Sequence, residues 1–568
     1  MPIQRLLILL TAVFLMPVSP ARAELRVWTE TATRRVLREE APGSGLEVRI
    51  ALARNEWRSF QILVRSDQPV KTLTVVPGDL VGPAGAKLTP SSARLFRQHQ
   101  MHITVGTTRN DTFRPSWYPD GLVPFSHPLT GRPLPDATLA AVPFDLPADE
   151  THGFWVDLFA PPGTRPGVYR GVYGLEIGGG RAASIPVELT VWDFELPATP
   201  TMRTAFGAPD GRLKAWYAER AKAGREKMPD DWAAVENQCW RLLAEHRVNA
   251  TPPGEITRPV RQRDGSWLIP SAQVDRLREF VDRWHVNAVA APRPASVFAD
   301  PEKDRAGIEA WLKCLDRAAK ELDRPGVLFY IYLIDEPNDA EAYARVRSWG
   351  KTIRAAGTAV KVMVTEQTQT QDPAWGDLYG AVDVWCPLMP LFVPDSAAKR
   401  QALGESIWVY TALCQRTKTP WWHIDYPLLH YRVPAWIAWR YRIRGLLYWG
   451  GMSYWKQVDD PWNEPWTYGH GKEGARGRAY NGEGTLVYPA SAAGYDGIAP
   501  SIRLKALRDA IEDYDYLALL EGLGRSNEAR GLVEPLVESW FKWETDPTAY
   551  DRAREKLAAL ILNARTRP

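Results

Sequence analysis

Residues 328–338 read LFYIYLIDEPN and predict a buried strand that ends in two acids. The first seven residues are apolar or aromatic, which is typical of a parallel strand covered on both faces. Asp335 and Glu336 follow at its carboxyl end, where a barrel of alternating strands and helices carries its active site. The alternative is that Asp335 caps the next helix and Glu336 forms a surface ion pair. Pro337 favours an extended Glu336 on a turn out of the strand, so we interpret the pair as catalytic.

The chain before this strand changes texture near Pro197. Short alternating segments, such as 60–65 (FQILVR), 153–159 (GFWVDLF) and 185–192 (IPVELTVW), are separated by turns rich in Gly and Pro. This alternation is typical of antiparallel strands with one buried face. It predicts a β-sandwich domain over residues 24–197.

The central part of the chain alternates short apolar strands with longer helical stretches. Repeated strand–helix units of this kind favour a closed TIM-like (β/α)8 barrel, which we place at residues 198–500. The expected strands lie near residues 248–250, 286–290, 327–334, 360–365, 382–386, 407–410 and 445–449.

Helical periodicity returns after Ser501, with Leu504, Leu507 and Ile511 at three- and four-residue steps. It predicts that residues 501–568 form C-terminal helices packed on the barrel. The spacing of Arg508 and Glu512 suggests an ion pair on the helix surface, and Asp513 and Asp515 suggest a solvated face. The fold class is therefore a multidomain mixture of sandwich, barrel and helices.

The first 23 residues have the features of a secretory signal. Arg5 precedes the apolar stretch 6–16, and Ala21-Arg22-Ala23 provides a small-residue exit, so cleavage is expected after Ala23. The stretch is too short to span a membrane, and no later window is apolar enough. We expect a secreted or periplasmic protein without membrane insertion.

Composition narrows the class of partner. The net charge is +3 and no long Lys/Arg run occurs, which disfavours nucleic acid. Cys239, Cys314, Cys386 and Cys414 match no zinc spacing and are interpreted as buried small side chains. The 25 Trp and 21 Tyr residues favour carbohydrate, because aromatic faces stack on the C–H faces of sugars.

Three separated motifs resemble glycoside hydrolase family 123 and its relatives of unknown function. They are 335–337 (DEP), 482–489 (GEGTLVYP) and 501–517 (SIRLKALRDAIEDYDYL), and residues 155–157 and 166–171 resemble that family's N-terminal sandwich. The resemblance implies an exo-acting retaining β-N-acetylgalactosaminidase that uses substrate-assisted catalysis. It also implies that Glu336 is the general acid/base and that Asp335 orients the 2-acetamido group of the substrate.

Chain geometry independently favours this mechanism. A conventional retaining enzyme holds its acid and its nucleophile about 5 to 5.5 Å apart on opposite sides of the anomeric carbon. Neighbouring residues at one strand end cannot readily flank a sugar ring in that way. Two alternatives stay open: a conventional glycosidase with Glu366 or Asp425 as nucleophile, and a non-catalytic carbohydrate-binding or cell-envelope protein.

Later strand ends should line the same pocket. Trp385, Tyr426, Tyr448 and Trp449 are the predicted substrate contacts, although half of the residues on a barrel strand point outward. The histidines lack neighbouring ligands at recognisable spacing. We therefore predict no metal and no cofactor.

Overall fold

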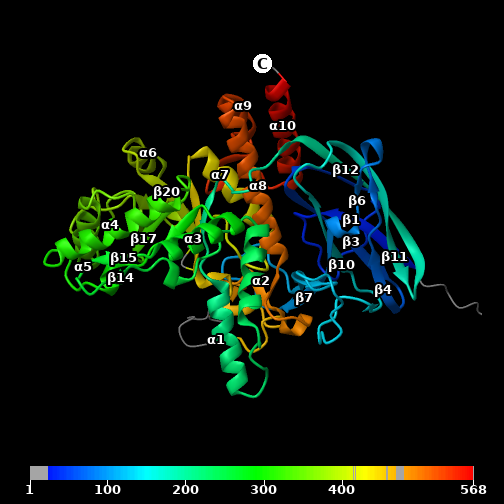
Figure 1. The fold of residues 1–568 in the computed structure, drawn as a ribbon. Coiled ribbons are helices and arrows are strands. Elements are labelled where there is room, and N and C mark those ends of the chain that lie inside the picture. The colour runs from blue at the N-terminus through cyan, green and yellow to red at the C-terminus, as the bar shows by residue number, and fades with distance from the viewer. Residues whose placement is uncertain (1–23, 414, 416–417, 456–457, 469–478, 567–568) are drawn as a thin grey trace, which may run out of the picture.

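The computed structural model describes residues 24–413, 415, 418–455, 458–468 and 479–566. Figure 1 shows an N-terminal sheet assembly and a barrel-like sheet on either side of the long helix α8 (Ile502–Gly522). The proposed signal segment and Cys414 lie outside the described residues. Within the described ranges, no helix is both long and apolar enough to cross a membrane.

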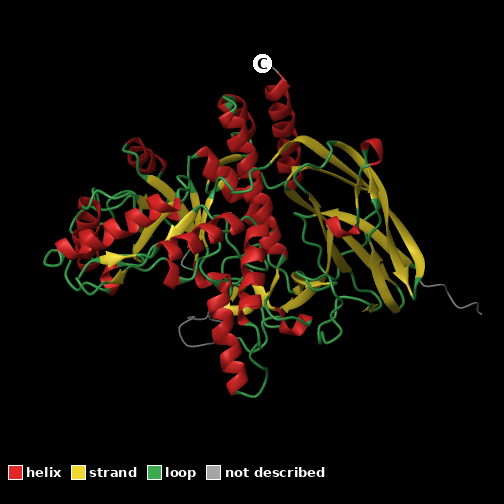
Figure 2. Cartoon of the chain, in the orientation of Figure 1, coloured by secondary structure: helices red, strands yellow, loops and turns green. Residues whose placement is uncertain are grey.

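Two sheets build the N-terminal part and face each other across one core (Figure 2). Phe60 and Phe154 from one sheet and Tyr173 and Leu189 from the other belong to the same buried cluster. This is the arrangement of a β-sandwich, and it follows from the alternation of apolar and polar residues.

The first sheet contains, in order, β1 (Leu25–Thr31), β3 (Glu56–Ser66), β10 (His152–Ala160), β7 (Ala93–Ile103) and β8 (Ser116–Pro124). The second contains β2 (Val48–Arg54), β12 (Gly180–Glu195), β11 (Gly167–Ile177), β4 (Val70–Val76) and β9 (Phe144–Leu146). In addition, β5 (Leu80–Val81) pairs with β11, and β6 (Lys87–Leu88) pairs with β5.

The central sheet is parallel and contains seven paired strands among the described residues, not the predicted eight. Helices follow most of its strands and cover the outer face, as in a barrel of βα units. The strand order is β13 (Arg203–Ala205), β21 (Gly445–Tyr448), β20 (Ser406–Thr411), β19 (Val384–Trp385), β18 (Lys361–Val364), β17 (Leu328–Ile334) and β16 (Ala288–Ala290). The helices are α1 (Pro209–Lys222), α2 (Trp232–Glu245), α3 (Ser271–Trp284), α4 (Arg305–Leu322), α5 (Ala340–Ala355), α6 (Pro394–Ala402) and α7 (Leu429–Arg440).

The predicted strand at 248–250 is wrong, because these residues join no ladder. They lie where the sheet would close between β13 and β16, and the side chain of Asn249 makes the link instead. Its Nδ2 donates to the carbonyl of Thr204 at 2.9 Å and to Oδ1 of Asn287 at 2.8 Å. Its Oδ1 accepts from the backbone N–H of Asn287 at 3.0 Å. A side-chain amide therefore bridges a gap that backbone pairing leaves open.

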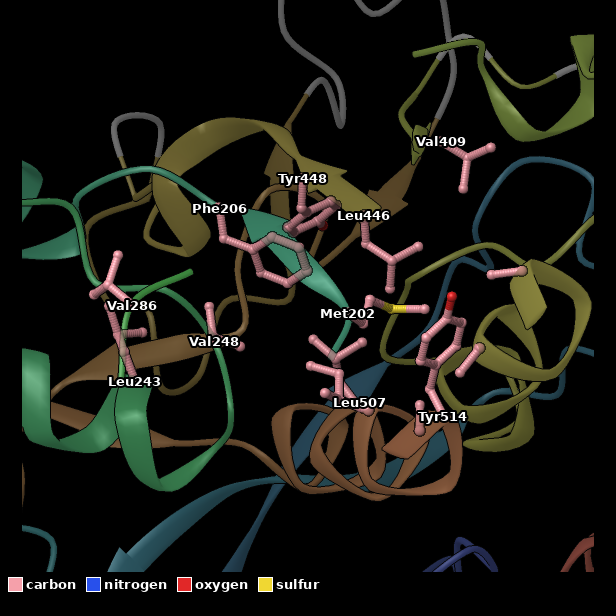
Figure 3. Packing of buried hydrophobic residues seen from close by; sticks show 14 of the residues in the cluster. Met202, Phe206, Leu243, Val248, Val286, Val409, Leu446, Tyr448, Leu507 and Tyr514 are labelled. Atoms are coloured by element: carbon pink, nitrogen blue, oxygen red, sulfur yellow. The ribbon is translucent and has the colours of Figure 1, made fainter. Parts of the chain in front are cut away.

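Helix α8 is the centre of the molecule, not a cap on the barrel. Ser501 begins it by accepting a hydrogen bond from the N–H of Leu504 at 3.1 Å. Figure 3 shows Leu507 and Tyr514 of α8 near Met202 and Leu446, which belong to the barrel segment and to the same core cluster. On its other side the helix contacts β3 and β8 of the sandwich.

The predicted surface position of the α8 charges is wrong. Arg508, Glu512, Asp513 and Asp515 are at most 1% exposed. Sequence spacing shows which helix residues are neighbours but not what covers them. Their partners come from distant segments: Arg508 pairs with Asp157 of β10, Glu512 with Arg247, Asp513 with Arg432 and Asp515 with Arg247.

The remaining C-terminal residues combine helices with a hairpin, so the predicted all-helical segment is only partly right. They are α9 (Ser526–Val533), the strands β26 (Val537–Ser539) and β27 (Lys542–Trp543), and α10 (Pro547–Thr566). Three further strand pairs are β14 (Val260–Arg261) with β15 (Trp267–Leu268), β22 (Trp466–Tyr468) with β23 (Tyr480–Asn481), and β24 (Val487–Pro489) with β25 (Ile498–Pro500). Short 3-10 helices cover Pro83–Gly85, Pro90–Ser92, Gly254–Ile256, Pro294–Ser296, Met389–Leu391, Trp449–Met452 and Ala490–Ala493. Cys239, Cys314 and Cys386 are buried, as predicted, and they are free thiols.

Candidate active site

Strand β17 ends at a cavity of about 640 Å³. Its pairing with β18 shifts register between Tyr332 and Ile334, an irregularity that turns the strand just before the two acids. Asp335 is exposed and Glu336 is partly buried, and both line the cavity. Among the described lining residues they are the only acids, and Arg212 is the only base.

The cavity lies at the carboxyl ends of the barrel strands. Residues from β13, β16, β17, β20 and β21 contribute to its wall, as the barrel architecture requires for convergent side chains. The strand-end residues are Thr204, Ala205, Ala288, Ala290, Tyr330, Tyr332, Thr365, Tyr410, Leu447 and Tyr448.

Asp335 is held through one of its two carboxylate oxygens. Its Oδ1 accepts hydrogen bonds from the hydroxyls of Tyr332 and of Thr365, the latter at 3.0 Å. Within the described part of the chain, Oδ2 has no hydrogen-bond partner. One oxygen is therefore fixed by the protein and the other is available to a ligand in the cavity.

Glu336 is held at its side chain and at its backbone. The hydroxyl of Tyr410 donates to Oε1 at 2.5 Å, and the backbone N–H donates to Oγ1 of Thr365 at 2.8 Å. Its φ of 40° lies in the left-handed region, which is unfavourable for a side chain with a Cβ. The expected extended conformation is therefore wrong, because these contacts outweigh the preference imposed by Pro337. Such strain is common where an active site orients a side chain.

Glu366, one candidate nucleophile, is 1% exposed and does not line the cavity. Its Oε1 accepts from the N–H of Gln367 at 2.7 Å. Burial raises the pKa of this carboxyl to about 7, and the nearby charge of Glu336 adds to the increase. Glu366 is therefore a buried carboxyl group near the two acids, and it does not line the cavity in which a substrate would bind.

Asp425, the other candidate nucleophile, forms hydrogen bonds that join two parts of the fold. Its carboxylate accepts from the backbone N–H and the hydroxyl of Thr107, both at 2.7 Å, and from Asn110 at 3.2 Å. These bonds attach the sandwich loop that precedes β8 to the barrel. Asp425 does not line the cavity either.

Two of the four predicted substrate contacts line the cavity and two do not. Tyr448 and Trp449 line the cavity with the two acids, whereas Trp385 and Tyr426 do not. Trp385 points into the outer layer, where its Nε1 donates to Glu405 at 2.7 Å. Tyr426 lines a second cavity, on the other side of the loop that follows β20.

The turn Gly482-Glu483-Gly484 supports the cavity wall from behind. The φ angles of 77° and 70° at the two glycines form a tight turn that other residues would strain. The N–H of Gly484 donates to the Tyr448 hydroxyl at 2.7 Å, and Glu483 Oε1 accepts from Trp449 Nε1. The turn therefore positions two aromatic residues of the wall.

Glu483 is completely buried, and burial raises its pKa to about 8. Its Oε2 lies 3.2 Å from Nε2 of His423, whose pKa burial lowers well below the usual range. At neutral pH the acid is therefore protonated and the imidazole is neutral. The contact with Trp449 is therefore a hydrogen bond to a neutral carboxyl group, and it orients the indole ring.

Sequence reasoning missed the three polar residues that hold the two acids, which are Tyr332, Thr365 and Tyr410. Thr365 and Tyr410 lie at strand ends, so the rule that selected Trp385 could have found them. Tyr332 contacts Asp335 because the strand turns between them, which no sequence pattern indicated. In the described ranges, no three His, Cys, Asp or Glu side chains are grouped so that they could hold a metal.

Comparison with known proteins agrees with the motifs. Residues 299–520 match the family model described as glycoside hydrolase 123, catalytic domain. A family 123 glycoside hydrolase from Clostridium perfringens has a similar fold, with a TM-score of 0.63 at 14% identity, over 95% of this chain and 98% of that one. A family 39 glycoside hydrolase from Bacteroides cellulosilyticus aligns over 84% of this chain and 82% of its own, with a TM-score of 0.32 at 11% identity. No curated protein matches the chain.

Proposed function

Because residues 299–520 match the model of the glycoside hydrolase 123 catalytic domain, we propose that this chain is an exo-acting, retaining glycosidase. Its substrate would carry a terminal β-linked N-acetylhexosamine, with N-acetylgalactosamine favoured. The observation that carries the proposal is the adjacent pair Asp335 and Glu336, the only acids among the described residues that line the cavity. A family match alone supports a glycosidase and leaves the sugar open.

The pair suits substrate-assisted catalysis. Two neighbouring acids at one strand end reach the sugar from one side, so among the described residues that line the cavity no carboxylate is placed to attack the opposite face of the anomeric carbon. The carbonyl oxygen of the 2-acetamido group can make that attack instead. The burial of Glu366 and the loop contacts of Asp425 leave neither as a nucleophile in the cavity.

Each step assigns a role to one of the two acids. Glu336 donates a proton to the glycosidic oxygen as that bond breaks, while the acetamido oxygen bonds to the anomeric carbon and closes an oxazolinium ring. Asp335 accepts the acetamido N–H through Oδ2, which makes the attacking oxygen more nucleophilic. Water then opens the ring and transfers a proton to Glu336, and the configuration is retained.

The test is a screen of aryl glycosides with variants of both acids. We expect cleavage of N-acetyl-β-hexosaminides, loss of several orders of magnitude in Glu336→Gln with poor leaving groups, and severe loss in Asp335→Asn. Glu341→Gln, an 85% exposed acid on α5, is the matched control and should be unchanged. A thiazoline that mimics the closed ring should inhibit competitively.

Other outcomes would contradict this function in different ways. Efficient cleavage of a glycoside with a plain 2-hydroxyl, or a trapped covalent glycosyl-enzyme, would indicate a conventional double displacement. Binding of glycosides without any hydrolysis would indicate a carbohydrate-binding protein. Export to the periplasm or the medium is part of the proposal, and N-terminal sequencing of the exported chain would test cleavage after Ala23.

A further inference from the structure

A second cavity, of about 610 Å³, lies at the same end of the barrel as the first. Three separate segments line it: the sandwich loop 109–112, the segment 418–430 that runs into the start of α7, and the C-terminal hairpin with Trp543 in β27 and Thr545 just after it. Leu413 lines the catalytic cavity and packs against Trp421 and Tyr426, which line the second one. The two cavities are therefore neighbours across one wall.

Aromatic rings form much of this second cavity. The ring centroid of Tyr426 lies 6.0 Å from that of Trp421 and 5.0 Å from that of His430. The imidazole of His430 in turn lies 5.6 Å from Trp543, with the ring planes at 87°. The rings leave a hollow between them, which distinguishes the cluster from a packed core.

Polar atoms that form no hydrogen bond with the described residues lie among these rings. His430 Nδ1 accepts a hydrogen bond from the backbone N–H of Trp421 at 3.2 Å. Burial lowers the pKa of His430 to about 3, so the ring is neutral and its proton is on Nε2. Within the described ranges, no hydrogen bond is found for His430 Nε2, the Tyr426 hydroxyl or Trp543 Nε1.

We infer that this cavity is a second, non-catalytic carbohydrate site that binds a neutral sugar residue of a glycan. Aromatic faces suit the C–H faces of a pyranose, and the three polar atoms suit its hydroxyl or acetamido oxygens. Asn110, Thr112 and Thr545 add further polar groups to the lining, and the charged residues Arg109, Asp111 and Lys418 line the cavity as well. The choice of a sugar as ligand rests on the proposed function, whereas the unfilled cavity and its unpaired donors do not.

A second site so close to the catalytic cavity would raise the effective concentration of a bound glycan at the catalytic cavity. A glycan held at one cavity presents its other residues to the neighbouring cavity, so occupancy of both can exceed either single affinity. This role requires no chemistry at the second site. Short aryl glycosides would not use it.

Calorimetric titration with neutral disaccharides tests the inference directly. Lactose, cellobiose and chitobiose are titrated into the full chain while the thiazoline fills the catalytic cavity, so that any remaining heat reports another site. We expect at least one disaccharide to bind with a Kd below about 20 mM. Trp543→Ala should weaken it about tenfold or more, and Tyr426→Phe, which keeps the ring and removes the hydroxyl, should weaken it less.

Phe541→Ala is the matched control, because Phe541 is in the same hairpin, is 48% exposed and does not line the cavity. It should bind like the wild type, and all three variants should cleave aryl glycosides normally. No disaccharide binding, or equal binding by Trp543→Ala and wild type, would overturn the site. Absence of hydrolysis with intact Trp543-dependent binding would overturn the proposed function and leave the site standing.

Discussion

The side-chain hydroxyl of Thr365 accepts a hydrogen bond from the backbone N–H of Glu336 at 2.8 Å. The same hydroxyl donates to Oδ1 of Asp335 at 3.0 Å. One residue at the end of β18 therefore fixes both acids at the end of β17. This contact also stabilises Glu336 at its φ of 40°.

Replacing Thr365 by Val should remove both bonds while keeping the shape of the side chain. Because one bond is to a carboxylate, we expect kcat/KM to fall about 10- to 100-fold on an N-acetyl-β-hexosaminide. Thr365→Ser keeps the hydroxyl and should recover most of the activity. Equal rates for Thr365→Val and wild type would show that the hydroxyl does not position the acids.

Glu483 should act as a positioning residue for Trp449. Glu483→Gln keeps a neutral acceptor for the indole N–H, so its kcat/KM should stay within about threefold of the wild type. Glu483→Ala removes the acceptor and should lower kcat/KM about tenfold or more, mainly through KM, because Trp449 lines the substrate cavity. The indole fluorescence spectrum should change in the Ala variant only. A purely structural role would instead lower the melting temperature of Glu483→Ala without changing KM.

Glu366 should make the free energy of unfolding depend on pH between the acidic and the neutral range. Its folded pKa of about 7 lies above the unfolded value, so its contribution is complete below about pH 4.5. That contribution is lost as the pH rises from about 4.5 to 7. In Glu366→Gln this loss, on the order of 3 kcal/mol, should disappear from urea denaturation curves measured at pH 5 and pH 8.

The activity of Glu366→Gln provides a second measurement. Because Glu366 does not face the cavity, we expect turnover close to that of the wild type. A loss as large as that of Glu336→Gln would reinstate Glu366 as the nucleophile of a conventional mechanism.

Asp157 should anchor the sandwich to α8. Burial alone would raise its pKa, but Arg508 and Lys505 outweigh this effect and hold the pKa well below its usual range. Its stabilising contribution is therefore present above the unfolded pKa of about 3.9 and is lost as the pH falls below that value. Asp157→Asn removes the carboxylate that contacts two buried cations, Lys505 and Arg508, and should cost about 3 to 5 kcal/mol in denaturant unfolding.

Glu188→Gln is the control for this ion pair. Its partner Arg170 is 70% exposed, so the change should stay within about 0.5 kcal/mol. Equal destabilisation by Asp157→Asn and Glu188→Gln would contradict the anchoring role.

Much of the architecture was predictable because it depends on local pattern. Apolar runs and alternation identified β17 and the sandwich strands, and the rule for barrel strand ends placed Asp335, Glu336, Tyr448 and Trp449 around one space. These features need only the side-chain periods of strands and helices, which the chain itself displays.

The remaining features depend on contacts between distant segments, and only the tertiary structure decided them. A strand of two residues is too short to show in the sequence which of its side chains faces inward. Only the structure shows that Trp385 points outward, where it contacts Glu405. Helical spacing could not show that the charges of α8 are buried, because their partners, such as Asp157 and Arg432, are far away in the sequence. Tyr332 became part of the site, and Tyr426 part of a second cavity, for the same reason. Register and packing set which side chains meet, and neither is encoded in a local pattern.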